Sequence, residues 1–162
     1  MSRTTELRDE LKARFYPLLH EKGFTLDKGQ GPYCRTFRKI VNDEVYVLEL
    51  QWDKYHRPRF VINFGASFSK DIEFGGRKIE AVETSPVHLH NQGRLYPRKV
   101  RLETTRSWFC QDRHFLLRWL GFKNFPASSI VDQAITAFKD LETFWATGEK
   151  TDRIRYYPDL NK

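Results

Sequence analysis

The chain has 162 residues, 40% hydrophobic and 15% aromatic, a length and composition that predict one compact domain. The formal net charge of +7 favours anionic partners such as nucleic acid, an acidic protein surface or a phosphorylated ligand. No apolar run approaches the roughly 18 to 20 residues of a membrane helix, and the charged N-terminus lacks the apolar core of a signal peptide. We therefore expect a cytoplasmic protein with no membrane partner.

Residues 5–22 are predicted to form the first helix. Apolar residues recur there at three- and four-residue steps from Leu7 to Leu19, as a core-facing helix requires. Gly23 is a natural helix end. Pro17 interrupts the pattern and should kink or split the helix, because its ring removes one backbone donor.

Three runs with strand character follow, at residues 33–41, 44–52 and 59–68. The second is apolar on both faces in its first half, which predicts an interior strand. The third alternates apolar and polar residues, which is typical of a half-buried antiparallel strand. Short connections make these runs a meander, and residues 100–104 carry a weaker strand signal. We expect an antiparallel sheet of three to five strands.

Two helices are predicted in the C-terminal part, at residues 112–122 and 126–148. The first carries aromatic residues and leucines on one side and ends at Gly121. The second has a regular apolar stripe, with Ser129 and Asp132 spaced as in a capping box. Together the elements predict an α+β fold with an N-terminal helix, an antiparallel meander sheet, and C-terminal helices packed on one sheet face.

The predicted domain covers residues 1–148, and the charged residues 149–162 are expected to form an extended tail. The four tryptophans are mostly expected in the core, since large aromatic side chains dominate core packing. Trp108 is the exception, because it follows a basic segment and could cover a groove.

No common catalytic signature is present: the chain has no P-loop, no G-x-G-x-x-G, no G-x-S-x-G and no H-E-x-x-H. Cys34 and Cys110 lie far apart, outside any C-x-x-C pair, and are expected to be reduced thiols. His88 and His90 would share one face of a strand, but a metal site needs further ligands that their neighbours do not supply. We expect no catalytic residue, no metal and no cofactor.

The most distinctive segment is residues 86–102, which contains four basic residues and no carboxylate. Its basic cluster consists of Arg94, Arg98, Lys99 and Arg101, continues to Arg106, and is interleaved with Tyr96 and Trp108. Cations beside aromatic rings are typical of phosphate binding with base stacking, yet Arg and Tyr also dominate protein–protein contacts. The cluster is therefore a protein-contact surface, a nucleic-acid site or an ordinary solvated surface.

Two amides, Gln51 and Asn63, lie within predicted strands. If they share one sheet face, they form a polar floor beneath the 86–102 segment. Arg94 beside such a floor would make a concave patch suited to anions. We expect the binding site at this place, with the basic cluster and Trp108 around it.

Six short motifs follow one another over the first two-thirds of the chain. They are LLHEKGF (18–24), TFRK (36–39), VLELQW (47–52), FVINFG (60–65), GRL (93–95) and SWF (107–109). In this order they resemble the bacterial domain of unknown function 4304 family, which has no established catalytic residues. Such proteins occur beside toxin genes, so the resemblance implies an immunity-type role.

The function expected first is that of a non-enzymatic binding protein, an immunity-type inhibitor that contacts a toxin through its sheet face and basic loop. The alternative is a nucleic-acid-binding module that uses the cluster between Arg94 and Arg106. The third hypothesis is an enzyme that acts on an anionic substrate. Salt dependence separates the first two, because binding of a polyanion weakens steeply with salt.

Overall fold

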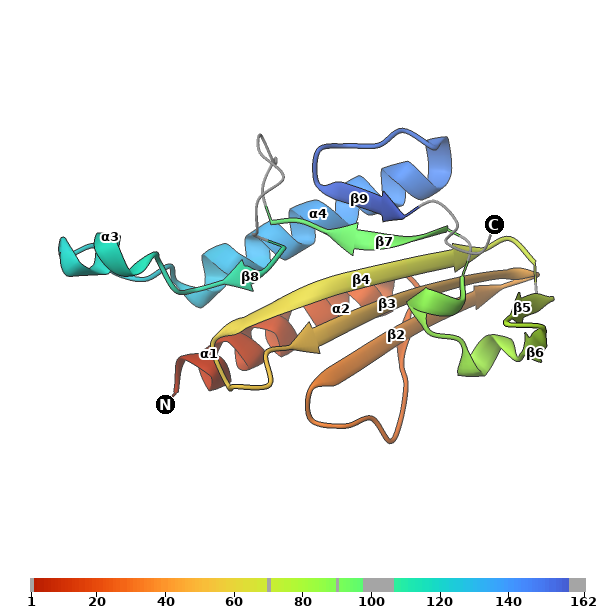
Figure 1. The fold of residues 1–162 in the computed structure, drawn as a ribbon, viewed down its shortest axis with the longest axis horizontal. Coiled ribbons are helices and arrows are strands. Elements are labelled where there is room, and N and C mark those ends of the chain that lie inside the picture. The colour runs from red at the N-terminus through yellow and green to blue at the C-terminus, as the bar shows by residue number, and fades with distance from the viewer. Residues whose placement is uncertain (1, 70, 90, 98–106, 158–162) are drawn as a thin grey trace.

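The computed structural model describes residues 2–69, 71–89, 91–97 and 107–157 (Figure 1). The helices are α1 (Arg3–Glu10), α2 (Tyr16–Glu21), α3 (Phe115–Trp119) and α4 (Ala127–Thr147). A π-helical turn, η1 (Leu11–Phe15), joins α1 to α2, and two 3-10 turns are η2 (Ala81–Glu83) and η3 (Pro86–His88). The strands are β1 (Thr25–Leu26), β2 (Cys34–Val41), β3 (Glu44–Trp52), β4 (Arg59–Ser67), β5 (Ile72–Phe74), β6 (Arg77–Ile79), β7 (Asn91–Leu95), β8 (Phe109–Cys110) and β9 (Ile154–Tyr157).

The main sheet has seven strands, all paired antiparallel, in the order β1-β2-β3-β4-β7-β9, with β8 pairing the start of β4. The meander β2-β3-β4 is confirmed, and β3 is the interior strand that its two-sided apolar pattern predicts. The sheet is larger than expected, because four of its strands are only two to five residues long.

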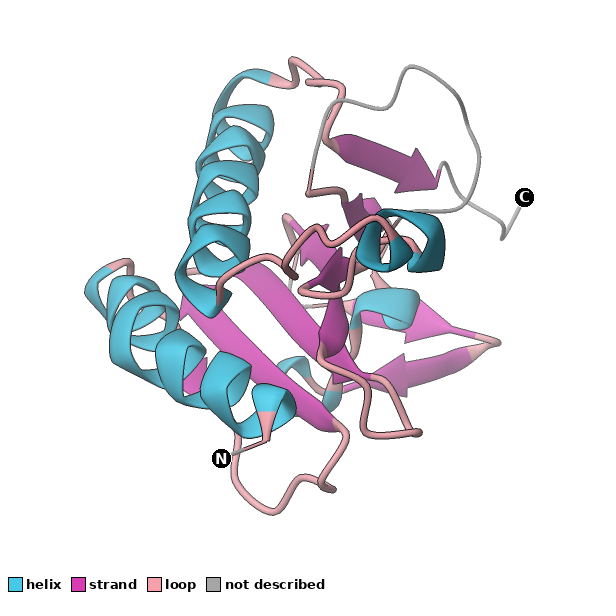
Figure 2. Ribbon diagram, turned by 90° about the vertical axis from the view of Figure 1, so that its left-hand side faces the viewer, coloured by secondary structure: helices cyan, strands magenta, loops and turns pink. Residues whose placement is uncertain are grey.

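Helices α1, α2 and α4 lie on one face of the sheet, which we call the inner face (Figure 2). The largest core cluster lies between them and the even-numbered side chains of β3 and β4. Phe60, Ile62 and Phe64 are fully buried on this face, as the alternation in β4 predicts. From α4 the cluster includes Phe138 and Leu141, which are also fully buried.

Pro17 splits the N-terminal helix, as predicted. It has no backbone donor, so the α-helical bond pattern cannot continue through it. The change begins one residue earlier, where the Tyr16 amide donates to the Leu11 carbonyl, five residues back, and forms the π turn η1. Leu11 and Phe15 are fully buried, so the turn keeps the apolar stripe facing the core.

The opposite side of the sheet, the outer face, carries a second and smaller core. Val45 and Val47 of β3 pack there against Ile72 and Leu89. The hairpin β5–β6 and the turns η2 and η3 supply this cover, which lies over one end of the sheet (Figure 1). The remainder of the outer face has no helix of four or more residues over it among the described residues (Figure 2).

Several sequence predictions are corrected. Helix α4 begins at Ala127 with Pro126 as its N-cap and no side-chain cap, so Ser129 and Asp132 form no capping box; Asp132 instead pairs with Arg14, with 2.5 Å between Oδ1 and Nη2. The fixed φ of Pro126 favours this earlier start. Residues 91–95, expected to be irregular, form β7. The weak strand signal at 100–104 lies outside the described residues.

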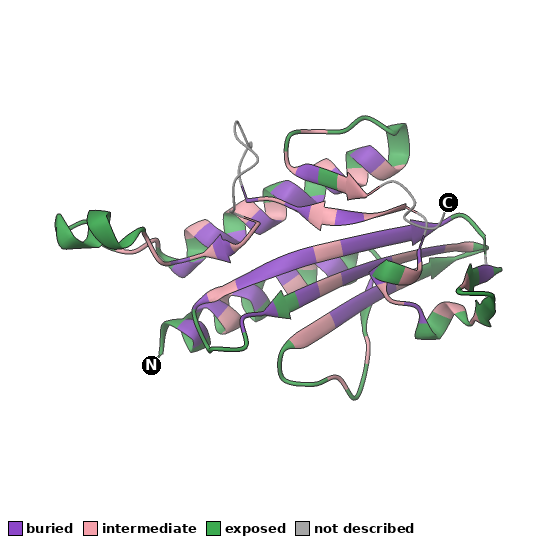
Figure 3. Cartoon of the chain, in the orientation of Figure 1, coloured by how far each residue is buried: buried purple, intermediate pink, exposed green. Residues whose placement is uncertain are grey.

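Further corrections concern the C-terminal half. Of the two C-terminal helices, only α4 packs on the sheet, whereas α3 is exposed along its length (Figure 3). Trp119 on α3 is 83% exposed, so the expectation of mostly buried tryptophans is wrong for it, while Trp52 is buried. Within the expected tail, residues 154–157 form β9 at the edge of the sheet. No helix among the described residues is long and apolar enough to cross a membrane.

Candidate binding site on the outer face of the sheet

A hollow of about 220 Å³ lies on the outer face, beside the 3-10 turn η3. It is lined by Glu49, Asn63, Ser85, Pro86, Val87, Gln92, Gly93, Arg94 and Tyr157. Four neighbouring strands and one turn therefore meet at it. Among these lining residues, Glu49 is the one carboxylate and Arg94 the one guanidinium.

The floor of the hollow is part of a row that crosses five strands in register. Residue pairs in the ladder join Thr36, Glu49, Asn63, Arg94 and Arg155, in that order from β2 to β9. Residues directly opposite one another in an antiparallel sheet point to the same face. The sheet thus places these polar side chains side by side, although they are far apart in the sequence.

Asn63 ties this row together. Its Nδ2 donates to Glu49 Oε1 at 2.9 Å, and its Oδ1 accepts from Arg94 Nε at 2.8 Å. One amide therefore fixes the side chains of both neighbouring strands, with each of its polar atoms satisfied. The arrangement orients the Arg94 side chain before any ligand is present.

The hydrogen bond to Asn63 uses only the Nε of Arg94. No described residue forms a salt bridge with this guanidinium, and Arg94 lines the hollow. A planar guanidinium presents paired donors that match the geometry of a carboxylate or phosphate. The site is consequently able to receive an anionic oxygen pair.

Arg155 lies directly opposite Arg94 in the β7–β9 pair. Its Nη1 donates to the Tyr96 hydroxyl at 3.2 Å, and its guanidinium lies 5.6 Å from the centre of the Tyr157 ring. Two arginines therefore lie side by side at this end of the row, an arrangement that is unfavourable unless other groups contact them. The Glu49 end of the row is negative by contrast.

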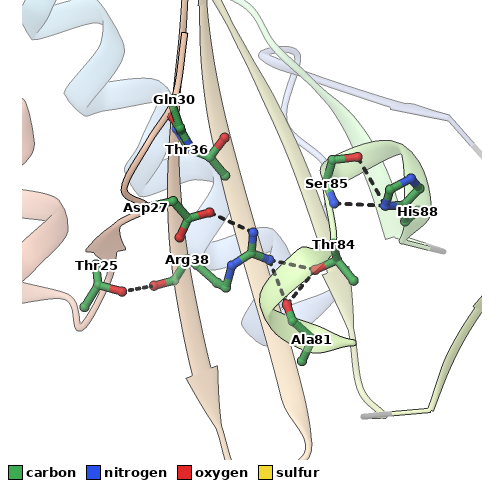
Figure 4. Close-up of polar contacts among 9 residues, drawn as sticks. All are labelled: Thr25, Asp27, Gln30, Thr36, Arg38, Ala81, Thr84, Ser85 and His88. Atoms are coloured by element: carbon green, nitrogen blue, oxygen red, sulfur yellow. Dashed lines mark hydrogen bonds and ion pairs between the residues drawn. The ribbon is translucent and has the colours of Figure 1, made fainter. Parts of the chain in front are cut away.

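The wall of the hollow is a segment fastened to the sheet by a buried arginine (Figure 4). Arg38 of β2 donates to the Ala81 carbonyl at 2.8 Å and to Thr84 Oγ1 at 2.7 Å, and it pairs with Asp27 at 2.8 Å. Its side chain is 7% exposed, and these bonds satisfy both terminal nitrogens, while the buried Nε has no partner among the described residues. They hold the chain just before Ser85 against the outer face.

The turn η3 is closed by its own side chains. The Ser85 amide donates to His88 Nδ1 at 3.1 Å, and the two side chains are 3.4 Å apart (Figure 4). Beneath it, a Cβ on Gly65 would lie 3.0 Å from the Pro86 Cα and from Leu89, so glycine allows this turn to rest on β4. His88 therefore has a structural role at the wall.

The predicted site residues are only partly brought together. Asn63 and Arg94 are hydrogen-bonded, whereas Gln51 is exposed on the same face but does not line the hollow. Trp108 is half-buried, and the Arg59 guanidinium lies 4.4 Å from its ring centre. Further predicted residues lie outside the described residues; these are Arg98, Lys99, Arg101, Arg106 and His90.

Sequence reasoning missed four residues of the site region. These are Glu49, Gln92, Arg155 and Tyr157. Glu49 was accessible to it, because alternation along β3 places it on the same face as Gln51. The other three depend on β7 and β9, whose pairing has no strong sequence signal.

The two cysteines have the properties of ordinary protonated thiols. Burial raises the pKa of Cys34 and of Cys110, which keeps both thiols protonated at neutral pH. Both are free cysteines. Among the described residues, no group of three or more His, Cys, Asp or Glu side chains could hold a metal ion.

Comparisons with known proteins add no identification. No family model matches the chain, no curated protein matches it, and no solved structure matches it. The resemblance to the domain of unknown function 4304 family therefore stays a prediction.

Proposed function

We propose that this protein is a non-enzymatic binding protein that receives an acidic side chain of a partner protein on Arg94. The observation that carries the proposal is the hydrogen-bonded row Glu49–Asn63–Arg94 beside a hollow of about 220 Å³. The row orients one guanidinium through its Nε, and this arginine lines the hollow. A carboxylate is the group that matches a guanidinium in shape and charge.

The size of the hollow favours a single inserted side chain. Sites for whole small molecules usually measure about 300–1,000 Å³, and this one is smaller. Glu49 also lies at its edge and would repel a chain of phosphates. A partner protein that inserts one carboxylate, with donor groups toward Glu49, satisfies both constraints.

The resemblance noted in the sequence implies the kind of partner. A toxin held inactive by contact with this face, in the cytoplasm, is the partner that an immunity-type role would have. The nucleic-acid hypothesis depends on basic residues of which Arg98, Lys99 and Arg101 lie outside the described residues. The test described below distinguishes nucleic-acid binding from protein binding.

Affinity capture from native lysate tests the proposal when three forms of the protein are compared. These are the wild type, an Arg94→Gln variant and an Arg77→Gln control. Arg77 is exposed on β6 and lies away from the hollow, so the control carries the same loss of charge. We expect one protein to be retained by the wild type and the control and lost from Arg94→Gln.

Two results would contradict the proposal. One is retention that does not depend on Arg94. The other is retention of nuclease-sensitive material that weakens steeply with salt, which would favour the nucleic-acid alternative, since counterion release makes polyanion binding strongly salt-dependent.

A further inference from the structure

A second surface, unrelated to the hollow, is the lobe formed by residues 111–125 around α3. It extends away from the rest of the molecule at one end (Figure 1). Six of its large apolar side chains are exposed, namely Phe115, Leu116, Leu117, Trp119, Leu120 and Phe122, while Phe125 at the neck is half-buried. A soluble protein rarely exposes so many contiguous apolar side chains unless they meet a partner.

The lobe is a closed loop with a fixed neck. The Phe125 amide donates to the Gln111 carbonyl at 2.8 Å, which joins its two ends. Arg113 donates through its amide to Asn124 Oδ1 at 3.2 Å and through Nε to the Lys123 carbonyl at 2.7 Å. The Arg113 guanidinium also lies 4.0 Å from the Phe125 ring centre.

The tip of the lobe is also well formed. Helix α3 ends in a Schellman motif, in which the Phe122 amide donates to Leu117 and the Gly121 amide to Arg118, both at 3.0 Å. Gly121 has a φ of 83°, the left-handed conformation that this motif needs. The exposed side chains therefore sit on an ordered turn that positions them outside the domain.

The apolar side chains surround most of the helix. At 3.6 residues per turn, the positions of Phe115, Trp119, Leu116, Leu120 and Leu117 span an arc of roughly 200°. A helix that docks in a protein groove needs a narrower stripe, of about 100° or somewhat more. A wide arc is suited to insertion into a medium that surrounds the tip.

The lobe carries a net positive charge. Its basic residues are Arg113, Arg118 and Lys123, and its one carboxylate, Asp112, pairs with Arg3 at the neck, so no Asp or Glu lies on the exposed part between Arg113 and Phe125. Aromatic rings with basic residues beside them are typical of segments that enter the interface of an anionic bilayer. We propose that the 111–125 lobe docks on the surface of a membrane that contains anionic phospholipids.

A second copy of this chain fits the lobe less well. Two lobes packed against each other would bring six Lys and Arg side chains together, while the one carboxylate of each lobe, Asp112, is already paired with Arg3. The sequence expectation of no membrane partner depended on the lack of a spanning segment. Docking of a lobe on a bilayer surface requires no span.

Cosedimentation with vesicles tests this inference directly. We expect the protein to bind vesicles of phosphatidylcholine and phosphatidylglycerol in equal amounts, and to bind pure phosphatidylcholine at least about tenfold more weakly. Replacing Leu116 and Leu120 by Ser should weaken binding to the anionic vesicles at least about tenfold. The matched control replaces Val41 and Val82 by Ser. Both valines are exposed outside the lobe, so this variant should bind like the wild type.

A fluorescence measurement keeps the test valid if the double Leu variant fails to fold. Trp119→Phe preserves an apolar ring, so it should bind the vesicles but lose the lipid-induced blue shift of tryptophan emission. Failure of the wild type to bind anionic vesicles would overturn the inference. So would unchanged binding of the Leu variant, an unaltered blue shift in Trp119→Phe, or a stable dimer of the wild type that the Leu variant abolishes.

Discussion

Arg94 Nε donates to Asn63 Oδ1 at 2.8 Å, and the two residues are direct partners in the ladder between β7 and β4. This bond fixes the orientation of the Arg94 side chain on the outer face. Because Asn63 also donates to Glu49, a change at Asn63 releases both charged side chains. The orientations of Glu49 and Arg94 therefore both depend on the Asn63 amide.

Replacing Asn63 by Ala should lower the free energy of unfolding by roughly 0.5–2 kcal/mol, since two half-buried hydrogen bonds are lost. Urea denaturation measures this change. Gln51→Ala, on the same face but exposed, is the control and should shift stability by under about 0.5 kcal/mol. Equal effects of the two substitutions would show that the row contributes nothing to stability.

Gly93 is required by close packing between β7, β9 and the core. A Cβ there would lie 2.3 Å from the Arg155 carbonyl oxygen and 2.5 Å from Phe64 Cζ. Gly93→Ala should therefore destabilise the protein by roughly 1–3 kcal/mol, through displacement of β9. Gly31 has open space around its Cα, so Gly31→Ala should leave the free energy of unfolding unchanged or raise it by up to about 1 kcal/mol. A Gly93→Ala variant as stable as the wild type would contradict the β7–β9 pairing.

Ile62 tests the assignment of the inner face. It is fully buried on β4, so Ile62→Ala should lower the free energy of unfolding by roughly 2–5 kcal/mol. Ile40 is 41% exposed at the end of β2, and Ile40→Ala should have a much smaller effect. Chemical denaturation of both variants gives the comparison, and similar losses would mean that the faces of the sheet are assigned wrongly.

Asp53 predicts a dependence of stability on pH. Burial acts to raise the pKa of this carboxyl, but hydrogen bonds from Arg57 and Arg59 outweigh it and hold the pKa below its ordinary value of 3.8. The folded pKa is depressed, so the contribution to stability is present above about pH 3.8 and is lost as the pH falls through the folded pKa.

Asp53→Asn should consequently destabilise the protein at neutral pH, and the difference from the wild type should shrink below about pH 3.8. Unfolding followed by circular dichroism across this range measures it. Asp71→Asn removes an exposed partner of Lys78 and should have little effect at any pH. A constant difference between Asp53→Asn and the wild type at all pH values would refute the ion-pair account.

The sequence predicted the elements that carry a long, regular pattern. The strands β3 and β4 were found because each is a nine-residue run rich in β-branched and aromatic residues, although β4 is buried on both faces rather than half-buried as expected. The strands β7 and β9 were missed, since each is short and half polar, and each is defined by its partner rather than by its own residues. Helix α3 was expected to pack on the sheet but is exposed, because an apolar stripe alone does not show whether a helix packs against the core of its own chain.

The candidate site was predicted in part for the same reason. Asn63 and Arg94 were identified as residue types suited to an anion site, and alternation placed Asn63 on the correct face. Their contact depends on the register between β4 and β7, which no local pattern contains. The position of Arg155 in the sheet was not predicted, because residues 149–162 have the charged composition of a solvated tail.

The central claim is that Arg94 binds an acidic side chain of a partner protein. Isothermal titration of the partner isolated by affinity capture, with the Arg94→Gln variant and the Arg77→Gln control, tests it most directly. Loss of one member of a desolvated charge pair typically costs about 2–5 kcal/mol, so Arg94→Gln should weaken binding by at least about 30-fold. Arg77→Gln should bind like the wild type. Full affinity of a folded Arg94→Gln variant would contradict the account.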